Sequence, residues 1–362
     1  MTPLVTATPN RSWLLDIQTI YMQPEVTTYV RGREILAAFP DAERIEVASH
    51  WNIPGLFGYE GNVEDWNRIK RNVLVLGIKS ALRAEPNDRS SDFIAPSHAN
   101  GCAMSCSYCY VPRQKGFANP ITTFVNIEQI AGYLRRHAGR QGPRTQPSQV
   151  DPAYWVYDIG CNSDCSVDAL LSRNVYDLME LFRELPNAKA SFATKYVNRE
   201  LLEFDPQRKT RIRLSLMPQQ VAKVVDVRTT PMSERIASIN DFHAAGYEVH
   251  LNFSPVIYTE TWEADYRALF AELADVLRPE VKVQLAAEVI FLTHHEGLHQ
   301  INLGWHPKGE ELLWRPELQE KKISQGGGLN LRYKRGFKGG LVDRFSQLLQ
   351  EQLPECRIRY AF

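Results

Sequence analysis

Short apolar runs recur along the middle of the chain, and amphipathic patterns lie between them. The clearest strand-like runs are NVLVLGI (72–78), AYWVYDIG (153–160), KASFATK (189–195), RIRLSLM (211–217), YEVHLNFSPVIY (247–258) and VKVQLAAEVIFL (281–292). Strands that alternate with helices in this way are typical of α/β folds built around a largely parallel sheet. The pattern therefore predicts a barrel or an open sheet whose working face lies at the carboxyl ends of its strands.

Two segments between these runs show the helical period. In SRNVYDLMELFREL (172–185), the apolar residues Val175, Leu178, Met179 and Phe182 share one face, and Ser172 is the expected N-cap. The segment TWEADYRALFAELADVL (261–277) shows the same kind of pattern. Both segments predict helices that pack against the sheet.

The two ends of the chain depart from this regular alternation. Residues 1–95 are less regular, and we expect them to form an N-terminal layer packed on a barrel formed by residues 96–300. In residues 301–362, a charged segment is followed by KKISQGGGLNLRYKRGFKGGL (321–341), which is rich in glycine and cations, and by a helical pattern near 341–352. We expect this last part to form a substrate-gripping β-hairpin and a closing helix.

Composition narrows the class of protein. With 362 residues, of which 44% are apolar, the chain can bury a substantial core. The 42 basic and 42 acidic residues give a net charge of zero. The protein as a whole therefore does not attract nucleic acid electrostatically, although one face of it could still be basic. No apolar run is long enough to span a bilayer, and the N-terminus does not resemble a signal peptide. We therefore expect a cytoplasmic protein with no membrane partner and with reduced thiols.

Three cysteines crowd into the segment NGCAMSCSYCY (100–110). Cys102, Cys106 and Cys109 have the spacing CxxxCxxC, and the remaining cysteines are Cys161, Cys165 and Cys356. A structural zinc site needs four protein ligands, and no second pair with ordinary zinc-site spacing follows. Three thiolates and one open position suit a [4Fe–4S] cluster. A partial zinc site and a chance grouping of buried thiols are the alternatives.

The spacing of this loop, with Tyr108 before its last cysteine, resembles the signature of the radical S-adenosylmethionine enzymes. The segment GCAMSCSYCY is similar to the corresponding loop of the spore photoproduct lyases, with a tyrosine on each side of Cys109, namely Tyr108 and Tyr110. Further similar segments are EVASHWNIPG, NVLVLGIKSAL, YDIGCNSD, SFATKY, RIRLSLMP and GYEVHLNFSPVIYTETWEADYRALFAEL. They cover nearly the whole chain in the same order, so the chain is identified as a member of the spore photoproduct lyase family.

The resemblance implies a fold, a reaction and a set of partners. The implied fold is a partial (β/α) barrel of the TIM type, and the implied reaction is direct repair of the DNA lesion 5-thyminyl-5,6-dihydrothymine. S-adenosylmethionine, bound to the open iron of a [4Fe–4S] cluster, would yield an adenosyl radical that abstracts a hydrogen from the lesion, after which the linking bond breaks. DNA with an ultraviolet-induced thymine lesion and an electron donor of the flavodoxin or ferredoxin type are the implied partners of a monomer.

The resemblance also assigns roles to individual residues. Cys161 would return a hydrogen atom to the thymine radical, and Tyr108 and Tyr110 would relay reducing equivalents back from the resulting thiyl. A weak S–H bond and a phenol suit these roles chemically. Lys195 and Ser215, and with them Ser163 and Asp164, would contact S-adenosylmethionine.

Structural interpretations of the same residues stay open. Cys161 could be a small buried hydrophobe. The tyrosines could simply pack around the cluster, and Lys195 could reach solvent from its strand end. Cys165 does not belong to the family pattern, and it is either inert packing or a competitor for the thiyl radical.

The substrate side shows two departures from the family. The segment of Arg332, Tyr333, Lys334, Arg335, Phe337 and Lys338 suits a hairpin that grips DNA, but the family has an arginine and a tyrosine at the tip where this chain has Phe337 and Lys338. His294 and His295 stand where the family has a histidine–arginine pair, and they either replace one contact or lie on the surface. These departures leave two rivals: a radical enzyme acting on another lesion, a modified base or a peptide, and a non-catalytic, metal-stabilised nucleic-acid-binding module.

Overall fold

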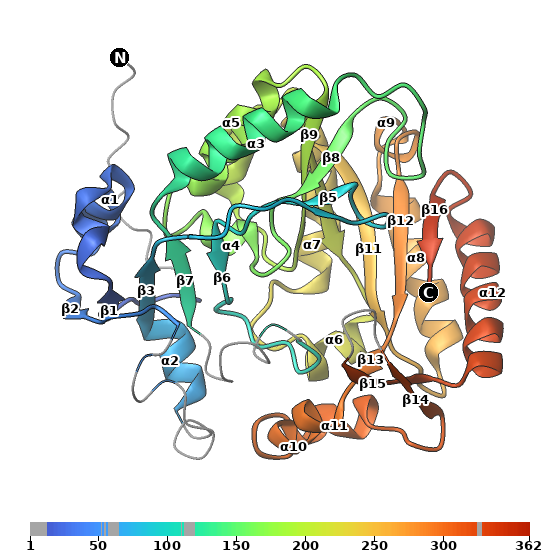
Figure 1. Ribbon diagram of the computed structural model, residues 1–362. Helices are drawn as coiled ribbons and strands as arrows, with labels where there is room; N and C mark the ends of the chain where they lie inside the picture. Colours follow the sequence, from blue (N-terminus) through green and yellow to red (C-terminus); the bar gives the residue numbers. More distant parts are fainter. Residues whose placement is uncertain are drawn as a thin grey trace.

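An eight-stranded sheet carries the middle and the end of the chain in a computed structural model (Figure 1). The structure describes residues 13–51, 53, 56, 65–109, 111, 120–323 and 328–362. In spatial order the strands are β16 (Arg357–Ala361), β12 (Ala286–Phe291), β11 (Glu248–Val256), β10 (Thr210–Ser215), β9 (Ala188–Thr194), β8 (Trp155–Asp158), β5 (Phe93–Ile94) and β4 (Glu85–Pro86). Every neighbouring pair is parallel except β4–β5. The sheet curls into a half-barrel, which confirms the predicted fold class.

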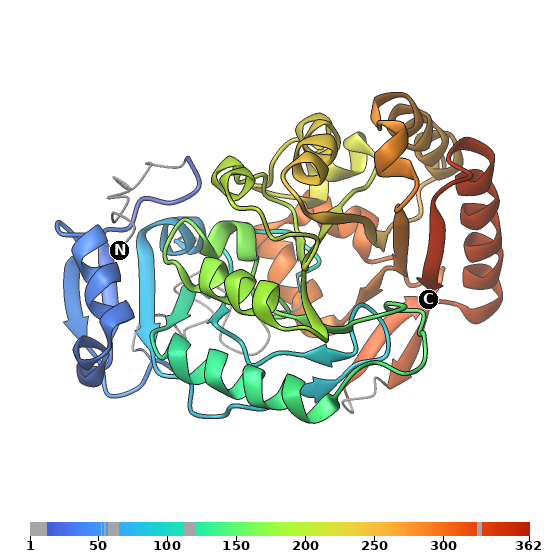
Figure 2. The same ribbon diagram turned by 90° about the horizontal axis from the view of Figure 1, so that it is seen from above.

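Helices cover the outer face of this sheet (Figure 2). They are α3 (Ile127–Gln141), α4 (Cys165–Asp168), α5 (Asn174–Glu184), α7 (Met232–Ala244), α8 (Trp262–Val276), α9 (Pro279–Lys282), α12 (Arg335–Gln352) and the 3-10 helix η3 (Arg199–Glu203). Helix α6 (Gln219–Val225) lies instead at the carboxyl ends of the strands (Figure 1). Among the described residues, none of the helices combines the length and the apolar character needed to cross a membrane.

A second sheet of five strands joins the half-barrel on the side of the N-terminus (Figure 1). Its order is β2 (Glu43–Glu46), β1 (Thr19–Met22), β3 (Val73–Gly77), β7 (Ile121–Phe124) and β6 (Ala99–Asn100), accompanied by η1 (Pro24–Thr28), α1 (Val30–Ala38) and α2 (Trp66–Asn72). A single bridge between Gly101 and Ser163 links the stretch after β6 to the stretch after β8. Because residues on both sides of position 95 contribute to this sheet, the division at 95, like the division at 300, stays a prediction.

The C-terminal part adds a small antiparallel sheet below the half-barrel (Figure 1). Strands β14 (Gln319–Ile323) and β15 (Leu329–Tyr333) form a hairpin, and β13 (Thr293–His294) pairs with β15. Helices α10 (Glu296–Trp305) and α11 (Pro307–Leu313) lie between β13 and β14 in the chain.

Three predicted boundaries are corrected. The run 281–292 is a strand only from Ala286, because Pro279 begins the short helix α9 and Val281 is buried on it. The closing helix starts at Arg335 and not near 341, so residues 335–338 lie in its first turn and not in a hairpin. Its glycines are tolerated because Leu341 and Phe345 bury one face of the helix against the core. Helix α5 starts after Arg173, and Ser172 accepts only a long hydrogen bond of 3.4 Å from the amide of Asn174.

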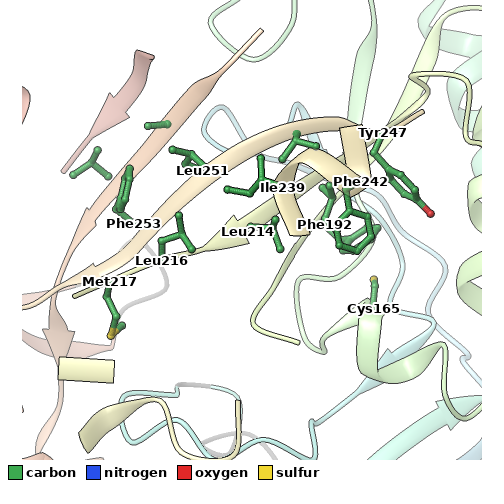
Figure 3. Packing of buried hydrophobic residues seen from close by; sticks show 14 of the residues in the cluster. Cys165, Phe192, Leu214, Leu216, Met217, Ile239, Phe242, Tyr247, Leu251 and Phe253 are labelled. Atoms are coloured by element: carbon green, nitrogen blue, oxygen red, sulfur yellow. The ribbon is translucent and has the colours of Figure 1, made fainter. Parts of the chain in front are cut away.

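The alternation of side chains along the barrel strands separates two environments. On the outer face, Leu214 and Leu251 pack with Phe192 against Ile239 and Phe242 of α7, as Figure 3 shows. These five side chains are almost completely removed from solvent. The outer layer is therefore the apolar core that holds the helices on the sheet.

The inner face of the same strands carries a network of buried ion pairs. Arg213 of β10 pairs with Asp158 of β8 at 2.5 Å and with Glu288 of β12 at 2.9 Å, and Arg359 of β16 pairs with Glu288 at 2.9 Å. Two residues earlier in β10, Arg211 pairs with Asp151 and with Glu248, both at 2.9 Å. The network therefore connects β8, β10, β11, β12 and β16 across the concave side.

Glu288 is the central acid of this network. Its side chain is 1% exposed. Burial alone would raise the pKa of its carboxyl, but the guanidinium groups of Arg213 and Arg359 outweigh burial and lower the pKa below its ordinary value. Glu288 is therefore an anion at neutral pH, and it compensates two buried cations.

Glu288→Gln should destabilise the fold strongly, because the isosteric amide leaves two buried guanidinium groups with less compensating charge. We expect a loss of about 3–5 kcal/mol in the free energy of unfolding, measured by urea titration. Glu263→Gln is the matched control, since Glu263 forms an exposed pair with Arg344 at 2.7 Å; its loss should not exceed about 1 kcal/mol. Equal losses in the two variants would contradict the assigned role of Glu288.

Candidate active site

A cavity of about 580 Å³ opens where the barrel strands end. Asp158, Thr194 and Ser215 line it from the ends of β8, β9 and β10. The predicted site residues that line it are Cys102, Cys106, Cys109, Tyr108, Cys161, Ser163, Asp164, Lys195 and Ser215. The fold thus gathers residues from the cluster loop and from three strand ends around one space of a size that suits a small ligand.

Backbone hydrogen bonds fix the cluster loop, which we define as residues 102–109. The amides of Ser105 and Ser107 donate to the carbonyls of Val227 and Val225 at 3.0 and 2.9 Å, respectively. Within the loop, the amide of Cys109 donates to the carbonyl of Cys106 at 3.0 Å. The end of α6 and the residues that follow it therefore hold the backbone of the loop.

The donor set of this loop fits a three-thiolate metal cluster. Cys102, Cys106 and Cys109 form no disulfide, and all three line the cavity. Burial raises the pKa of the thiols of Cys102 and Cys106, so without a metal these thiols are neutral, and cationic iron would displace their protons on binding. These three cysteines would hold an iron–sulfur cluster at the wall of the cavity.

Tyr108 lies between the cluster loop and a buried ion pair. Its hydroxyl donates a hydrogen bond to Asp226, whose carboxylate pairs with Arg235 at 3.0 Å. The amino group of Lys195 lies 5.5 Å from the centroid of the Tyr108 ring. Burial, and after it the charge of Asp226, raises the pKa of the Tyr108 phenol well above its ordinary value, so the hydroxyl keeps its proton. Tyr110 lies outside the described residues.

Cys161 follows Gly160 in the turn after β8. A Cβ atom at Gly160 would lie 3.0 Å from the Cys165 sulfur and 3.1 Å from the Phe192 Cβ, so glycine avoids a tight contact at this position. The amide of Gly101 donates to the carbonyl of Asn162 at 2.9 Å. These contacts hold Cys161 at the cavity wall, opposite the packed core.

Asp164 is already well supplied with hydrogen bonds from the protein. Its carboxylate accepts from the Thr194 hydroxyl at 2.7 Å, from the Lys195 amide at 3.0 Å and from the Ser166 amide at 3.1 Å, where it caps α4. Burial raises the pKa of this carboxyl. The residue therefore ties the end of β9 to the start of α4, and a contact with S-adenosylmethionine stays a prediction.

The hydroxyls of Ser163 and Ser215 also have partners within the protein. Ser163 donates to Asp168 at 2.6 Å, and Ser215 accepts from the Asn252 side chain at 3.1 Å. Each oxygen keeps capacity for a further hydrogen bond toward the cavity.

Cys165 points away from the cavity into the core. Its sulfur lies 3.6 Å from Nε2 of His98, and the residue has no exposed surface. Burial lowers the pKa of His98 to about 4 and raises the pKa of the Cys165 thiol, so both groups are neutral. This environment favours the packing interpretation of Cys165.

His294 is buried, so a surface position for it is wrong. Its Nε2 lies 3.0 Å from both carboxylate oxygens of Glu310, and His299 Nδ1 lies 2.6 Å from the same group. The Asn302 amide donates to Glu310 at 2.5 Å and to the carbonyl of Ser107 at 2.6 Å. Three donors thus satisfy the carboxylate, and through Asn302 this group fixes α10 and α11 against the cluster loop. His295 has a different role, since its Nδ1 accepts from the Leu298 amide as the cap of α10.

The six residues predicted to grip DNA do not form one exposed hairpin. Tyr333 is 1% exposed and its hydroxyl accepts from the Tyr258 amide at 2.8 Å, while the ring of Phe337 packs on Tyr258 with centroids 5.0 Å apart. Arg332 pairs with Glu320 across the hairpin at 3.1 Å, and the Lys334 amino group donates to the carbonyl of Glu317. Arg335, Phe337 and Lys338 belong to α12. This segment joins the hairpin to the helix, and none of the six side chains lines the described part of the cavity.

Several residues in or near the cavity were not predicted from the sequence. Arg213, Glu288 and Asn252 line the cavity from the middle of strands, and Asn330 lines it from the hairpin. Arg213 and Glu288 could have been noticed, because a charged residue inside an apolar strand, as in RIRLSL and AAEVIF, indicates a buried polar site. Lys70 beside Cys102 and Asp226 beside Tyr108 had no such signal, because tertiary contacts alone bring them to the loop.

Comparison with known proteins gives one consistent result. The family model "Spore photoproduct lyase" matches residues 15–362. The chain is 27% identical to the spore photoproduct lyase of Bacillus subtilis (strain 168), over 95% of this chain and 97% of that protein, and 25% identical to that of Geobacillus sp. (strain Y412MC61), over 75% and 77%.

Solved structures share the fold. A spore photoproduct lyase variant with bound AdoMet and dinucleoside spore photoproduct has a TM-score of 0.86 at 22% identity, over 96% of this chain and 99% of that chain. A spore photoproduct lyase complexed with dinucleoside spore photoproduct has a TM-score of 0.86 at 23% identity, with the same coverage.

Asn302→Ala should loosen the cluster loop, because it removes the donor to the Ser107 carbonyl. We expect faster hydrogen exchange of the Ser105 and Ser107 amides, measured by mass spectrometry on peptides that span the loop. Asn240→Ala is the matched control, since the Asn240 side chain bridges the backbone of Val276 and Arg278 on the helical side. Unchanged exchange in the loop of Asn302→Ala would show that Asn302 does not hold it.

Proposed function

The chain belongs to the spore photoproduct lyase family, and from that premise we propose that it is a radical S-adenosylmethionine lyase that repairs 5-thyminyl-5,6-dihydrothymine in DNA directly. The observation that carries the proposal is the convergence on one cavity of the three loop cysteines, Tyr108 and Cys161. A cluster ligand set and a separate hydrogen-atom donor are the two parts that this reaction needs from a protein.

In this proposal Cys102, Cys106 and Cys109 hold a [4Fe–4S] cluster. Lys195 and Ser215 bind S-adenosylmethionine, and Ser163 and Asp164 complete its site. When bound, this pair of groups supplies an adenosyl radical that abstracts a hydrogen atom from the lesion. The role of the protein is to orient the cofactor and the substrate in one enclosed space and to exclude other hydrogen donors.

Cys161 completes the repair by hydrogen-atom transfer. Its S–H bond breaks, a C–H bond forms on the thymine radical left after fragmentation, and a thiyl radical remains on the sulfur. The Tyr108 hydroxyl then donates a hydrogen atom to that thiyl, so its O–H bond breaks, the S–H bond of Cys161 forms again and the radical moves to the Tyr108 oxygen. The raised pKa of the phenol supports this step, because a protonated hydroxyl has a hydrogen atom to give. Tyr110 is proposed to share the relay.

We propose that the hairpin β14–β15, and not the segment 332–338 alone, grips the DNA. Ile323 and Leu329 are partners in the hairpin register and are 69% and 53% exposed. Lys321 and Lys322 lie in the same exposed strand, and Asn330 reaches the cavity wall. This combination supports an apolar wedge beside phosphate-binding cations. Arg332, Lys334, Arg335 and Lys338 would add positive charge at the base.

The remaining partners belong to the same proposal. A flavodoxin or ferredoxin would deliver the electron, and a monomer in the cytoplasm, where thiols stay reduced, is the proposed state.

The direct test is anaerobic incubation of the reconstituted protein with S-adenosylmethionine, dithionite and an oligonucleotide that carries the lesion. We expect two restored thymines by mass spectrometry, and loss of repair on replacing any of the three loop cysteines with alanine. If 5'-deoxyadenosine forms while the lesion persists, the substrate is another lesion, a modified base or a peptide. A colourless protein with stoichiometric zinc would instead support a non-catalytic module.

Cys161→Ala should leave cofactor cleavage within about twofold of wild type while normal repair falls by at least about tenfold, because the thymine radical loses its hydrogen donor. The measurement is product analysis by mass spectrometry, where we expect thymine adducts. Cys356→Ala is the matched control, since Cys356 is a buried cysteine that does not line the cavity. Normal repair by Cys161→Ala would rule out Cys161 as the donor.

Lys321→Gln/Lys322→Gln should weaken DNA binding and reduce the slope of log affinity against log salt by about 2, since each phosphate contact contributes about 1. Fluorescence anisotropy over a salt series measures both effects. Arg136→Gln/Arg140→Gln removes two exposed cations from α3 on the outer face and should leave the slope unchanged. Identical slopes for wild type and the hairpin variant would remove the hairpin from the DNA interface.

A further inference from the structure

Lys70 reaches from the N-terminal part into the cluster loop. It lies on α2, is 4% exposed, and its Nζ donates a hydrogen bond to the carbonyl of Cys102 at 2.9 Å. In the sequence it is one cation in the run RIKRN, whose neighbours Arg68 and Arg71 point to solvent. The fold therefore buries one particular lysine of this run next to the proposed metal ligands.

Among the residues that the structure describes, the buried amino group of Lys70 has no carboxylate partner. In the described ranges, no acidic oxygen lies within 4.0 Å of its Nζ, whereas Lys189, which is also buried, pairs with Asp151 at 2.9 Å and with Glu248 at 2.7 Å. Burial lowers the pKa of Lys70, and thiolate charge on Cys102, Cys109 and Cys106 would oppose this effect. An isolated buried cation is unfavourable unless an anion compensates it.

Other groups around Lys70 do not supply that anion. Arg228, whose guanidinium donates to the carbonyl of Leu14 at 2.6 Å, adds a second cation beside Cys102. Burial lowers the pKa of His306 to about 4, and the charge of Lys70 acts in the same direction, so this imidazole is neutral. Apart from the cysteines, the charged group that acts on Lys70 within the described residues is thus a second cation, Arg228.

We propose that Lys70 tunes the cluster: its buried charge stabilises the reduced state of the metal centre held by Cys102, Cys106 and Cys109 and so raises its reduction potential. The inference rests on the proposed function, since it requires that these cysteines hold a [4Fe–4S] cluster. Three thiolates leave the oxidised centre with net negative charge, and one electron from the external donor increases that charge without moving a proton. A fixed cation in a site of low dielectric constant favours the more negative state.

Two substitutions of Lys70 separate the effect of its charge from the effect of its hydrogen bond. Lys70→Gln retains a donor for the Cys102 carbonyl but removes the charge, whereas Lys70→Arg retains the charge. Lys70→Met removes the charge without burying an amide, and it replaces Lys70→Gln if that variant does not fold. Lys79→Gln is the matched control, because Lys79 is a half-buried lysine that follows β3 in the same part of the chain and packs over the ring of Phe124.

The experiment is a redox titration of the full-length reconstituted protein, followed by the electron paramagnetic resonance signal of the reduced cluster, with iron and sulfide measured in each sample. At the midpoint potential of the wild type, we expect Lys70→Gln to lower the ratio of reduced to oxidised cluster about tenfold, a shift of about 59 mV for a one-electron couple. Lys70→Arg and Lys79→Gln should stay close to the wild type.

Failure of this inference differs from failure of the proposed function. If wild type and Lys70→Gln contain the same iron and sulfide and show the same potential, the tuning role is wrong while the cluster stands. A shift in Lys70→Arg as large as that in Lys70→Gln also overturns it, because the charge is then not the cause. If the wild-type protein assembles no iron–sulfur cluster at all, the proposed function itself falls.

Discussion

The paired charges on the concave face of the half-barrel are the constraint on which the rest of the structure depends. Helices cover one side of the sheet, and on the other side the buried charges of Arg213, Glu288 and Arg359 occupy the middle of the strands. Because each charge has a partner, the strands can enclose polar space without the cost of isolated buried ions. Arg213 and Glu288 of this network line the cavity, which opens at the carboxyl ends of the strands.

The cluster loop then gains its shape from three directions. The segment after α6 holds its backbone through Ser105 and Ser107, Asn302 holds it from the C-terminal helices, and Lys70 holds it from the N-terminal part. These contacts come from residues that are far apart in the sequence, so the tertiary fold and not the local sequence brings them to the loop. A preformed ligand set of this kind reduces the ordering cost of metal binding.

Burial also determines which groups near the cavity keep their protons. The Tyr108 phenol stays protonated because burial and Asp226 both disfavour its anion, and His98 stays neutral behind the cavity wall. Cys161 and Cys165 differ in their surroundings: Cys161 lines the cavity after β8, while Cys165 is completely buried in the core. The two thiols are four positions apart, and their surroundings assign them different chemistry.

The sequence alone determined the alternation of strands and helices, the three-cysteine spacing and the family likeness, because each depends on local pattern or on identity at fixed positions. It predicted β8 to β11 well, since their apolar outer face has a period of two. It failed at residues 281–285 and 335–340, where Pro279 and the buried face of α12 overrule a strand pattern and a glycine-rich composition. Only the tertiary structure decided that His294 is buried, that Tyr333 supports the base of a hairpin and that Lys70 meets Cys102. Such contacts join residues distant in the chain, and their energy comes from burial and charge pairing that no local pattern records.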